Sequence, residues 1–213
     1  MIKPVEVLKQ MIRRPGTIKY YLKRVNEYMA DIDMVKPVPI SALGIPVVFE
    51  PTQYSVSDTD SIVKIFDNFE ISENDAFIDI GCGKGAVISA LSKFKFNQID
   101  GIEYSKEVFQ IAKRNIATLK IKNTTIYNQN AADFPLYKKY THIYMYNPFG
   151  KSIMRKVIDK IEQTLMINNR SIYIIYANPV YHLEIIKHDI FQKSDACFSR
   201  LNYNIHIYKN EIL

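Results

Sequence analysis

Three alternating glycines, Gly81, Gly83 and Gly85, form the segment of this sequence with the clearest chemical meaning. They follow a short apolar stretch that carries one acid, Asp79, and they precede a stretch with helical spacing over Val87–Phe94. This order predicts a strand, a tight turn and the start of a helix. Because glycine has no Cβ, backbone N–H groups in such a turn can approach a negatively charged group of a cofactor, and the positive end of the helix favours that group.

The spacing of the glycines distinguishes between classes of cofactor. A dinucleotide fingerprint reads G-x-G-x-x-G and would indicate an NAD-type oxidoreductase, whereas this turn reads G-x-G-x-G with an acid two residues before it. The run Phe77–Gly85 resembles the first motif of the class I S-adenosylmethionine-dependent methyltransferases, (V/I/L)-D-(L/I)-G-x-G-x-G. The alternative is a simple chain turn. The resemblance implies a Rossmann-like domain that binds S-adenosyl-L-methionine through Asp79, Gly81, Cys82, Gly83 and Gly85.

A second acid lies where the ribose of a nucleotide cofactor would bind. Glu103 ends the stretch Asn97–Glu103, about 20 residues after the glycines, which is the spacing of the ribose-binding acid in nucleotide-binding α/β folds. The run Gly101–Ser105 resembles the second motif of the same family. Asp100 is the less favoured candidate because it falls inside the predicted strand.

The segment Gln129–Asp133 follows the third predicted strand, where the family usually has an acid and a small residue beside the adenine. Asn130 stands at the position of the acid, and its amide oxygen can accept a hydrogen bond from the adenine amino group. The resemblance implies adenine contacts by Asn130 and Ala131. Asp133 is the alternative for the polar contact.

Asn147, Pro148 and Phe149 follow the fourth predicted strand, which is the catalytic position of this fold. They resemble the (D/N/S)-P-P-(Y/F) motif of amino-group methyltransferases with one proline missing. In that motif the Asn side chain accepts a hydrogen bond from the target nitrogen, and the aromatic ring packs on the substrate. The resemblance therefore implies that these three residues orient an acceptor nitrogen, whereas the alternative is an Asn-Pro pair that only ends a strand.

The run Phe49–Tyr54, upstream of the glycines, is similar to a segment that folds over cofactor and substrate in small protein-lysine methyltransferases and in Dot1-like enzymes. The similarity implies cofactor contacts by Thr52 and Tyr54.

The histidines and cysteines do not have the spacing of a metal site, so we expect no metal. Cys82 and Cys197 are also too few for a disulfide framework. His142 falls inside the fourth predicted strand and is expected to be structural. His182 follows the fifth predicted strand and is the histidine that we would test as a base.

The composition predicts a soluble cytoplasmic protein. The chain has 213 residues, of which 47% are hydrophobic, and this is enough to build one α/β domain with a small accessory element. No apolar run approaches the roughly 20 residues of a membrane-spanning helix, and the first residues lack the apolar core of a signal peptide.

The net charge of +6 is concentrated near the N-terminus, where seven Lys and Arg side chains precede residue 25 against a single acid, Glu6. A basic segment of this kind can bind an anionic partner such as nucleic acid, an acidic protein or a phosphorylated substrate. The alternative is a solvated helix face.

Strand and helix patterns alternate from residue 57 onward. Helices are predicted over residues 58–69, 87–94, 105–119, 151–166 and 181–191. Strands are predicted over residues 76–80, 97–103, 125–128, 141–146 and 171–176, with a final hairpin over 196–201 and 205–208. This order favours an α/β fold with a doubly wound, mainly parallel sheet. The family resemblance implies seven strands and an antiparallel hairpin at the end.

We interpret residues 1–50 as a helical basic extension and linker and residues 51–213 as a Rossmann-like methyltransferase domain. The expected activity is methyl transfer to a nitrogen of a protein side chain or a nucleic-acid base. A small-molecule methyltransferase and a cofactor-binding, non-catalytic subunit of a complex are the alternatives.

Overall fold

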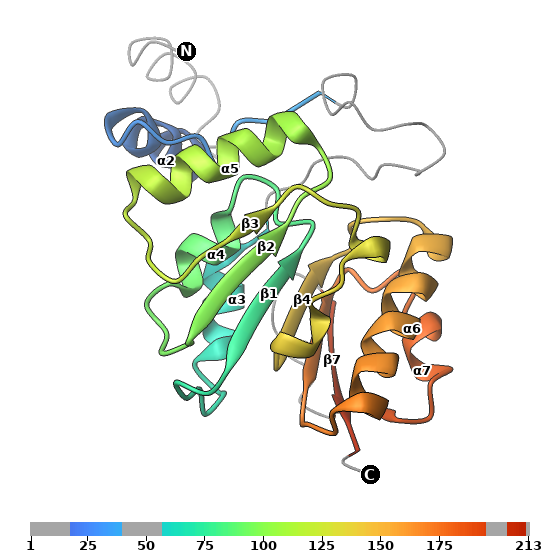
Figure 1. Cartoon of the computed structure of the whole chain (residues 1–213). Helices are drawn as coiled ribbons and strands as arrows, with labels where there is room; N and C mark the ends of the chain where they lie inside the picture. Colours follow the sequence, from blue (N-terminus) through green and yellow to red (C-terminus); the bar gives the residue numbers. More distant parts are fainter. Residues whose placement is uncertain (1–17, 40–56, 195–203, 212–213) are drawn as a thin grey trace.

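A seven-stranded sheet forms the centre of the protein in a computed structural model that describes residues 18–39, 57–194 and 204–211 (Figure 1). The strand order is β3-β2-β1-β4-β5-β7-β6. Strands β1 to β5 are mutually parallel, and β7 runs antiparallel to both β5 and β6. The predicted fold class is confirmed. The strands are β1 (Ala76–Ile80), β2 (Gln98–Ile102), β3 (Ile126–Tyr127), β4 (His142–Tyr146), β5 (Tyr173–Ala177), β6 (Phe191–Lys193) and β7 (Ile205–Asn210).

Helices cover both faces of the sheet and divide the core into two apolar clusters. Phe77 of β1 joins the cluster beneath α3, α4 and α5, whereas its neighbours Ile78 and Ile80 join the cluster beneath α6 and α7. Successive side chains of a strand point to opposite faces, so a strand buried on both faces reads as a continuous apolar run. The helices are α2 (Ile18–Met29), α3 (Thr59–Phe66), α4 (Ala86–Leu91), α5 (Lys106–Thr118), α6 (Lys151–Ile167) and α7 (Leu183–Ile186), with short 3-10 helices η4 (Ala131–Asp133) and η5 (Tyr137–Lys139).

The predicted boundaries agree best where the sequence carries a strong local signal. Strand β1 has the predicted bounds, and α5 begins one residue after its predicted cap, Ser105. The Oγ of Ser105 accepts a hydrogen bond from the backbone N–H of Val108 at 3.4 Å. In the described residues no helix is long and apolar enough to cross a membrane.

The C-terminal part of the sheet differs from the prediction in its boundaries. The helix predicted over residues 181–191 is wrong in length, since α7 ends at Ile186 and Phe191 already begins β6. Its apolar spacing was misleading because Leu183 and Ile186 are 55% and 42% exposed, whereas Phe191 is buried in the core. Strand β7 therefore lies between β5 and β6 and pairs with both. The predicted strand over 196–201 lies outside the described residues.

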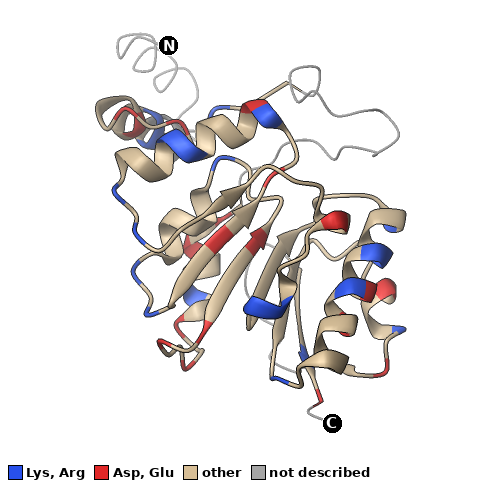
Figure 2. Cartoon of the chain, in the orientation of Figure 1, with Lys and Arg blue, Asp and Glu red and all other residues tan. Residues whose placement is uncertain are grey.

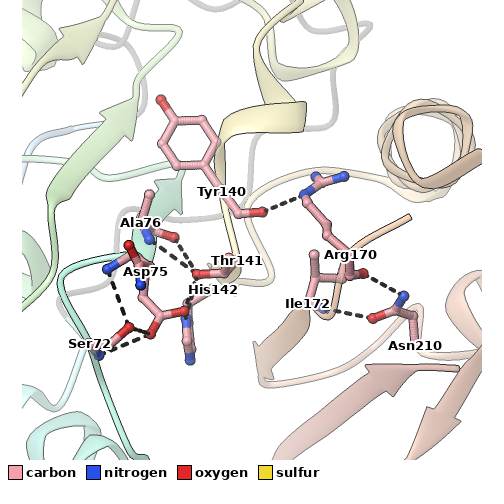
Figure 3. A network of polar contacts seen from close by, with 10 residues as sticks. Ser72, Asp75, Ala76, Tyr140, Thr141, His142, Arg170, Ile172 and Asn210 are labelled. Carbon is pink, nitrogen blue, oxygen red and sulfur yellow. Dashed lines mark hydrogen bonds and ion pairs between the residues drawn. The ribbon is translucent and has the colours of Figure 1, made fainter. Parts of the chain in front are cut away.

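Polar side chains tie the strands together at the edge of the sheet where β1, β4 and β5 begin (Figure 3). Asp75 accepts a hydrogen bond from the Oγ1 of Thr141 at 2.9 Å. The Oδ1 of Asn210 accepts from the N–H of Ile172 at 2.7 Å, and its Nδ2 donates to the carbonyl oxygen of Arg170 at 2.8 Å. These groups have protein partners and fix the strand register, so we interpret this edge as structural.

His142 belongs to the same structural edge, as the sequence predicted. Its imidazole lies 5.2 to 5.3 Å, centroid to centroid, from the rings of Phe69, Phe96 and Tyr173. Burial lowers the pKa of His142 to about 4, so the side chain is neutral near pH 7. The opposite edge of the sheet, where the parallel strands end, carries the glycine turn, Glu103 and Asn147.

Candidate active site

The alternating glycines form a tight turn between β1 and α4. Gly81, Gly83 and Gly85 have φ values of 78°, 54° and 86°, in the left-handed region that residues with a Cβ rarely adopt. The backbone N–H groups of Gly81 and Cys82 both donate to the carbonyl oxygen of Ile102 at 2.9 Å. The glycine spacing therefore meets a backbone requirement and fixes the turn to the end of β2.

The glycine turn packs closely against Pro148 on one side and against Gly101 of β2 on the other. A Cβ built on Gly81 would come within 2.6 Å of the Cβ of Pro148, so the turn touches the predicted acceptor motif. A Cβ on Gly101 of β2 would come within 2.7 Å of the Sγ of Cys82. The Cys82 thiol therefore packs against β2, and burial raises its pKa well above the usual value. A protonated, buried thiol is unreactive.

Two carboxyl groups lie close together beside the turn. The Oε2 of Glu103 accepts a hydrogen bond from the N–H of Gly83 at 3.0 Å, and its Oε1 accepts from the N–H of Ser105 at 2.8 Å. Asp79 is 3% exposed, and no residue in the described part of the chain donates a hydrogen bond to its carboxylate. Burial raises the pKa of both acids, and the charge of Glu103 raises that of Asp79 further. A cationic, hydrogen-bonding ligand would relieve this repulsion.

Glu103, the predicted ribose ligand, and Asp100 differ in their hydrogen-bond partners. Asp100 is fully buried, and its carboxylate accepts hydrogen bonds from Gln98 Nε2, Thr125 N and Tyr140 Oη at 3.0, 2.7 and 2.6 Å. Glu103 is half-buried and uses two hydrogen bonds. A carboxylate offers about four acceptor sites, so Glu103 retains capacity for ligand hydroxyl groups.

The predicted adenine residues lie on a short helix next to the end of β3. The Oδ1 of Asn130 accepts a hydrogen bond from the N–H of Ala132 at 3.0 Å and so caps η4. Ala131 is buried, Asn130 is half-buried and Asp133 is exposed. Lys160 of α6 donates to the carbonyl oxygen of Ala132 at 3.0 Å and holds the segment in place. The polar contact to adenine, by Asn130 or by Asp133, stays a prediction.

The predicted acceptor motif follows β4 in an unusual backbone conformation. Asn147 has φ 38°, a left-handed value that Asn tolerates better than most residues. Its Oδ1 accepts a hydrogen bond from the hydroxyl of Tyr176 at 3.2 Å, and that hydroxyl oxygen accepts one from the N–H of Tyr181 at 3.3 Å. Phe149 is half-buried against the cluster beneath α6. The Asn147 side chain is thus held at the end of β4, and Pro148 packs on the glycine turn.

The remaining sequence candidates are Thr52, Tyr54 and His182. Thr52 and Tyr54 lie outside the described residues. His182 is half-buried in the segment after β5, and its ring centroid lies 5.4 Å from that of His206.

A buried lysine within the glycine turn is a feature that sequence reasoning missed. Lys84 is 1% exposed, and its Nζ donates to the Oδ1 of Asp33 and the carbonyl oxygen of Lys36, both at 2.8 Å. Asn115 of α5 links the two residues further, since its Nδ2 donates hydrogen bonds to the backbone carbonyl oxygens of both Asp33 and Lys84. Burial lowers the pKa of Lys84, and the Asp33 carboxylate opposes that shift.

Residues 27–36 are folded so that Asp33 and Lys36 reach Lys84. The carboxylate of Glu27, on α2, accepts hydrogen bonds from the N–H of Val35 at 3.1 and 3.2 Å. Asp33, in the segment that follows α2, is hydrogen-bonded to Asn115 of α5. The sequence signal for the contact between Lys84 and Asp33 was the position of this Lys between Gly83 and Gly85 of the turn. Residues 27–36 therefore support the turn from the N-terminal side.

Comparison with known proteins identifies the family. Residues 71–198, more than half of the chain, match the family described as a methyltransferase domain. The chain belongs to this family. It carries the domain of a methyltransferase.

Individual relatives are distant from this methyltransferase. EEF1A lysine methyltransferase 2 of Danio rerio is 31% identical over 65 residues, which are 30% of this chain and 28% of that protein. Among solved structures, a SAM-dependent methyltransferase from Aquifex aeolicus has a TM-score of 0.54 at 15% identity and covers 73% of this chain and 90% of its own. A ribosomal protein L11 methylase from Lactobacillus delbrueckii subsp. bulgaricus has a TM-score of 0.56 at 15% identity, with coverages of 75% and 81%. These structures share the fold.

The residues beside the glycine turn fit the chemistry of S-adenosylmethionine. This cofactor carries an ammonium group, a sulfonium group and ribose hydroxyls, and the methyltransferase presents two adjacent acids, Asp79 and Glu103. The carboxylate of Asp79, which accepts no hydrogen bond from the described residues, and the spare acceptor sites of Glu103 suit those groups.

Proposed function

We propose that this methyltransferase transfers a methyl group to a nitrogen, with Asn147 orienting the acceptor. The hydrogen bond from Tyr176 to the Oδ1 of Asn147 is the observation that carries the proposal, because it fixes an amide oxygen at the end of β4. The contact between Pro148 and Gly81 brings this group beside the cofactor turn. An amide oxygen has a second lone pair that can accept a hydrogen bond from an acceptor amine.

The mechanism depends mainly on positioning. The sulfonium of S-adenosylmethionine makes its methyl group electrophilic, so the acceptor needs only an available lone pair and the correct direction of approach. In our proposal Asn147 accepts one N–H hydrogen bond of a neutral amine, which turns the nitrogen lone pair toward the methyl group. Phe149 packs against the acceptor.

A protein side chain is the acceptor that we favour, and a nucleic-acid base is the second candidate. The local similarity to a lysine methyltransferase supports a lysine amine. An RNA methyltransferase from Salinibacter ruber shares the fold with a TM-score of 0.51 at 14% identity, covering 75% of this chain and 94% of its own. Incubation of the protein with methyl-labelled S-adenosylmethionine and a cell extract, followed by separation of protein, RNA and small molecules, distinguishes the two.

The role of Asn147 is tested with Asn147→Gly, since glycine keeps the left-handed backbone and removes the amide. Asn123→Gly is the control, because Asn123 also has a left-handed backbone, with φ 53°, is exposed, and lies before β3 at the edge of the sheet where the parallel strands begin. We expect turnover by Asn147→Gly to fall about 100-fold or more, the size of effect seen when an aligning group is lost. S-adenosylhomocysteine affinity should stay within a few-fold. Full turnover by Asn147→Gly would overturn the amino-group proposal.

We also propose that the basic N-terminal segment binds an anionic partner or substrate. The structure dictates where a truncation should end, because α2 carries Glu27, which holds Val35 in place. Deletion of residues 1–17 removes four basic side chains and spares α2. The deletion should preserve cofactor binding and weaken methylation at low salt more than at high salt. Equal activity of the truncated and full chains at low salt would refute this proposal.

A further inference from the structure

Tyr176 occupies a distinctive place between the acceptor motif and the loop after β5. Its side chain is fully buried on β5, yet its hydroxyl reaches two groups at the end of the sheet. One is the side-chain oxygen of Asn147 at 3.2 Å, and the other is the backbone N–H of Tyr181 at 3.3 Å.

The directions of these two hydrogen bonds follow from the groups involved. A backbone N–H can only donate, so the hydroxyl oxygen of Tyr176 accepts from Tyr181. The hydroxyl proton is then available for the Oδ1 of Asn147. Because a hydroxyl donor faces that atom, the amide of Asn147 is oriented with its oxygen toward Tyr176.

The loop after β5 fixes this arrangement. Asn178 has φ 49°, and the chain turns there so that the N–H of Tyr181 meets the phenol. The N–H of Val180 donates to the carbonyl oxygen of Asn178 at 2.8 Å, which closes the turn. Burial also raises the pKa of Tyr176 to about 12, so the phenol remains a donor at neutral pH.

Resting on the proposed function, we propose that Tyr176 is a positioning residue that holds the Asn147 amide oxygen in the direction required by the acceptor amine. It acts through Asn147. Without the hydroxyl, the amide oxygen loses the donor that fixes its direction, and fewer molecules hold it toward the acceptor amine. Turnover would then fall because only a fraction of the enzyme has the productive orientation.

Tyr208 provides a matched control for the loss of a buried phenol. It is also fully buried, lies on β7 and belongs to the same apolar cluster as Tyr176. Its hydroxyl lies 3.0 Å from the Nδ1 of His206, a residue of its own strand. Tyr208→Phe and Tyr176→Phe therefore each remove one buried hydroxyl from the same cluster.

The experiment measures incorporation of labelled methyl from S-adenosylmethionine into cell-extract acceptors. For Tyr176→Phe we expect the saturating rate to fall about 5- to 10-fold, the equivalent of one net hydrogen bond, with an unchanged KM for S-adenosylmethionine. Tyr208→Phe should retain the full rate. In the Asn147→Gly background, Tyr176→Phe should cause no further loss, since the group that it positions is gone.

Two outcomes overturn the proposal. If Tyr176→Phe keeps the rate of Tyr208→Phe, or lowers the rate equally with and without Asn147, the hydroxyl of Tyr176 does not act through that amide. In both cases Asn147→Gly alone would still be impaired, and the amino-group proposal would stand. If Asn147→Gly itself is fully active, the proposed function fails and the positioning role fails with it.

Discussion

Replacement of Glu103 is the most direct test of the cofactor site, because this side chain links the glycine turn to the end of β2. Glu103→Ala removes the acceptor for the N–H groups of Gly83 and Ser105, at 3.0 and 2.8 Å, together with the proposed acceptor for the ribose hydroxyls. We therefore expect the change to lower both the stability of the free protein and its affinity for S-adenosylhomocysteine.

The contacts of Glu103 set the expected magnitudes. A hydrogen bond to a charged group contributes about 1.5–3 kcal/mol, and water will partly replace the lost acceptor in this half-buried position. We expect the free energy of unfolding to fall by about 1–3 kcal/mol. The affinity should weaken by a similar amount, or roughly 5- to 150-fold. Glu103→Gln should lie between wild type and Glu103→Ala, since its single side-chain oxygen can serve only one of the two N–H groups well.

Titration calorimetry with S-adenosylhomocysteine measures the affinity, and chemical denaturation measures the stability. Glu107→Ala is the control, because Glu107 is an exposed acid in the first turn of α5 and makes neither contact. It should bind like wild type. An unchanged affinity in Glu103→Ala would remove this residue from the cofactor site and refute the reasoning from spacing and hydrogen bonds.

Three further changes test the packing around the site. Gly81→Ala should weaken cofactor binding and lower the melting temperature by several degrees, because its Cβ would meet Pro148 at 2.6 Å in a left-handed backbone; wild-type values for both would contradict the packing. Asp33→Ala should lower the free energy of unfolding by about 1–3 kcal/mol, because the buried Lys84 loses its counter-ion, and adding Lys84→Met should restore part of the loss. The contribution of His142 should lower the free energy of unfolding as the pH falls from 6.5 to about 4. In this range the imidazole is protonated in the unfolded chain but stays neutral in the folded protein, where its pKa is about 4. Denaturation of His142→Phe over this pH range should show a smaller pH dependence, and equal slopes in both proteins would disprove the assignment.

The sequence by itself determined the order of the elements and the identity of the glycine turn. Apolar runs separated by helical spacing predicted β1 with its observed bounds, and Ser105 predicted the start of α5, because these signals act over a few neighbouring residues. The alternation of Gly81, Gly83 and Gly85 was informative for the same reason, since each requires a positive φ. The prediction was least accurate near the C-terminus, where the spacing of the exposed residues Leu183 and Ile186 indicated a longer helix than α7.

Tertiary structure decided which side chains meet. The contact of Lys84 with Asp33 spans 51 positions of the chain, and that of Tyr176 with Asn147 spans 29. Their spacing carries no periodicity that a sequence pattern could reveal. The fold also gave the two acids different surroundings, since Asp100 binds structural partners and Glu103 lies at the turn. Interactions between residues near one another in the sequence determined the turn and the strands. The assembled sheet brings the ends of the parallel strands to one edge, and this placed the hydrogen-bond donors and acceptors around the turn.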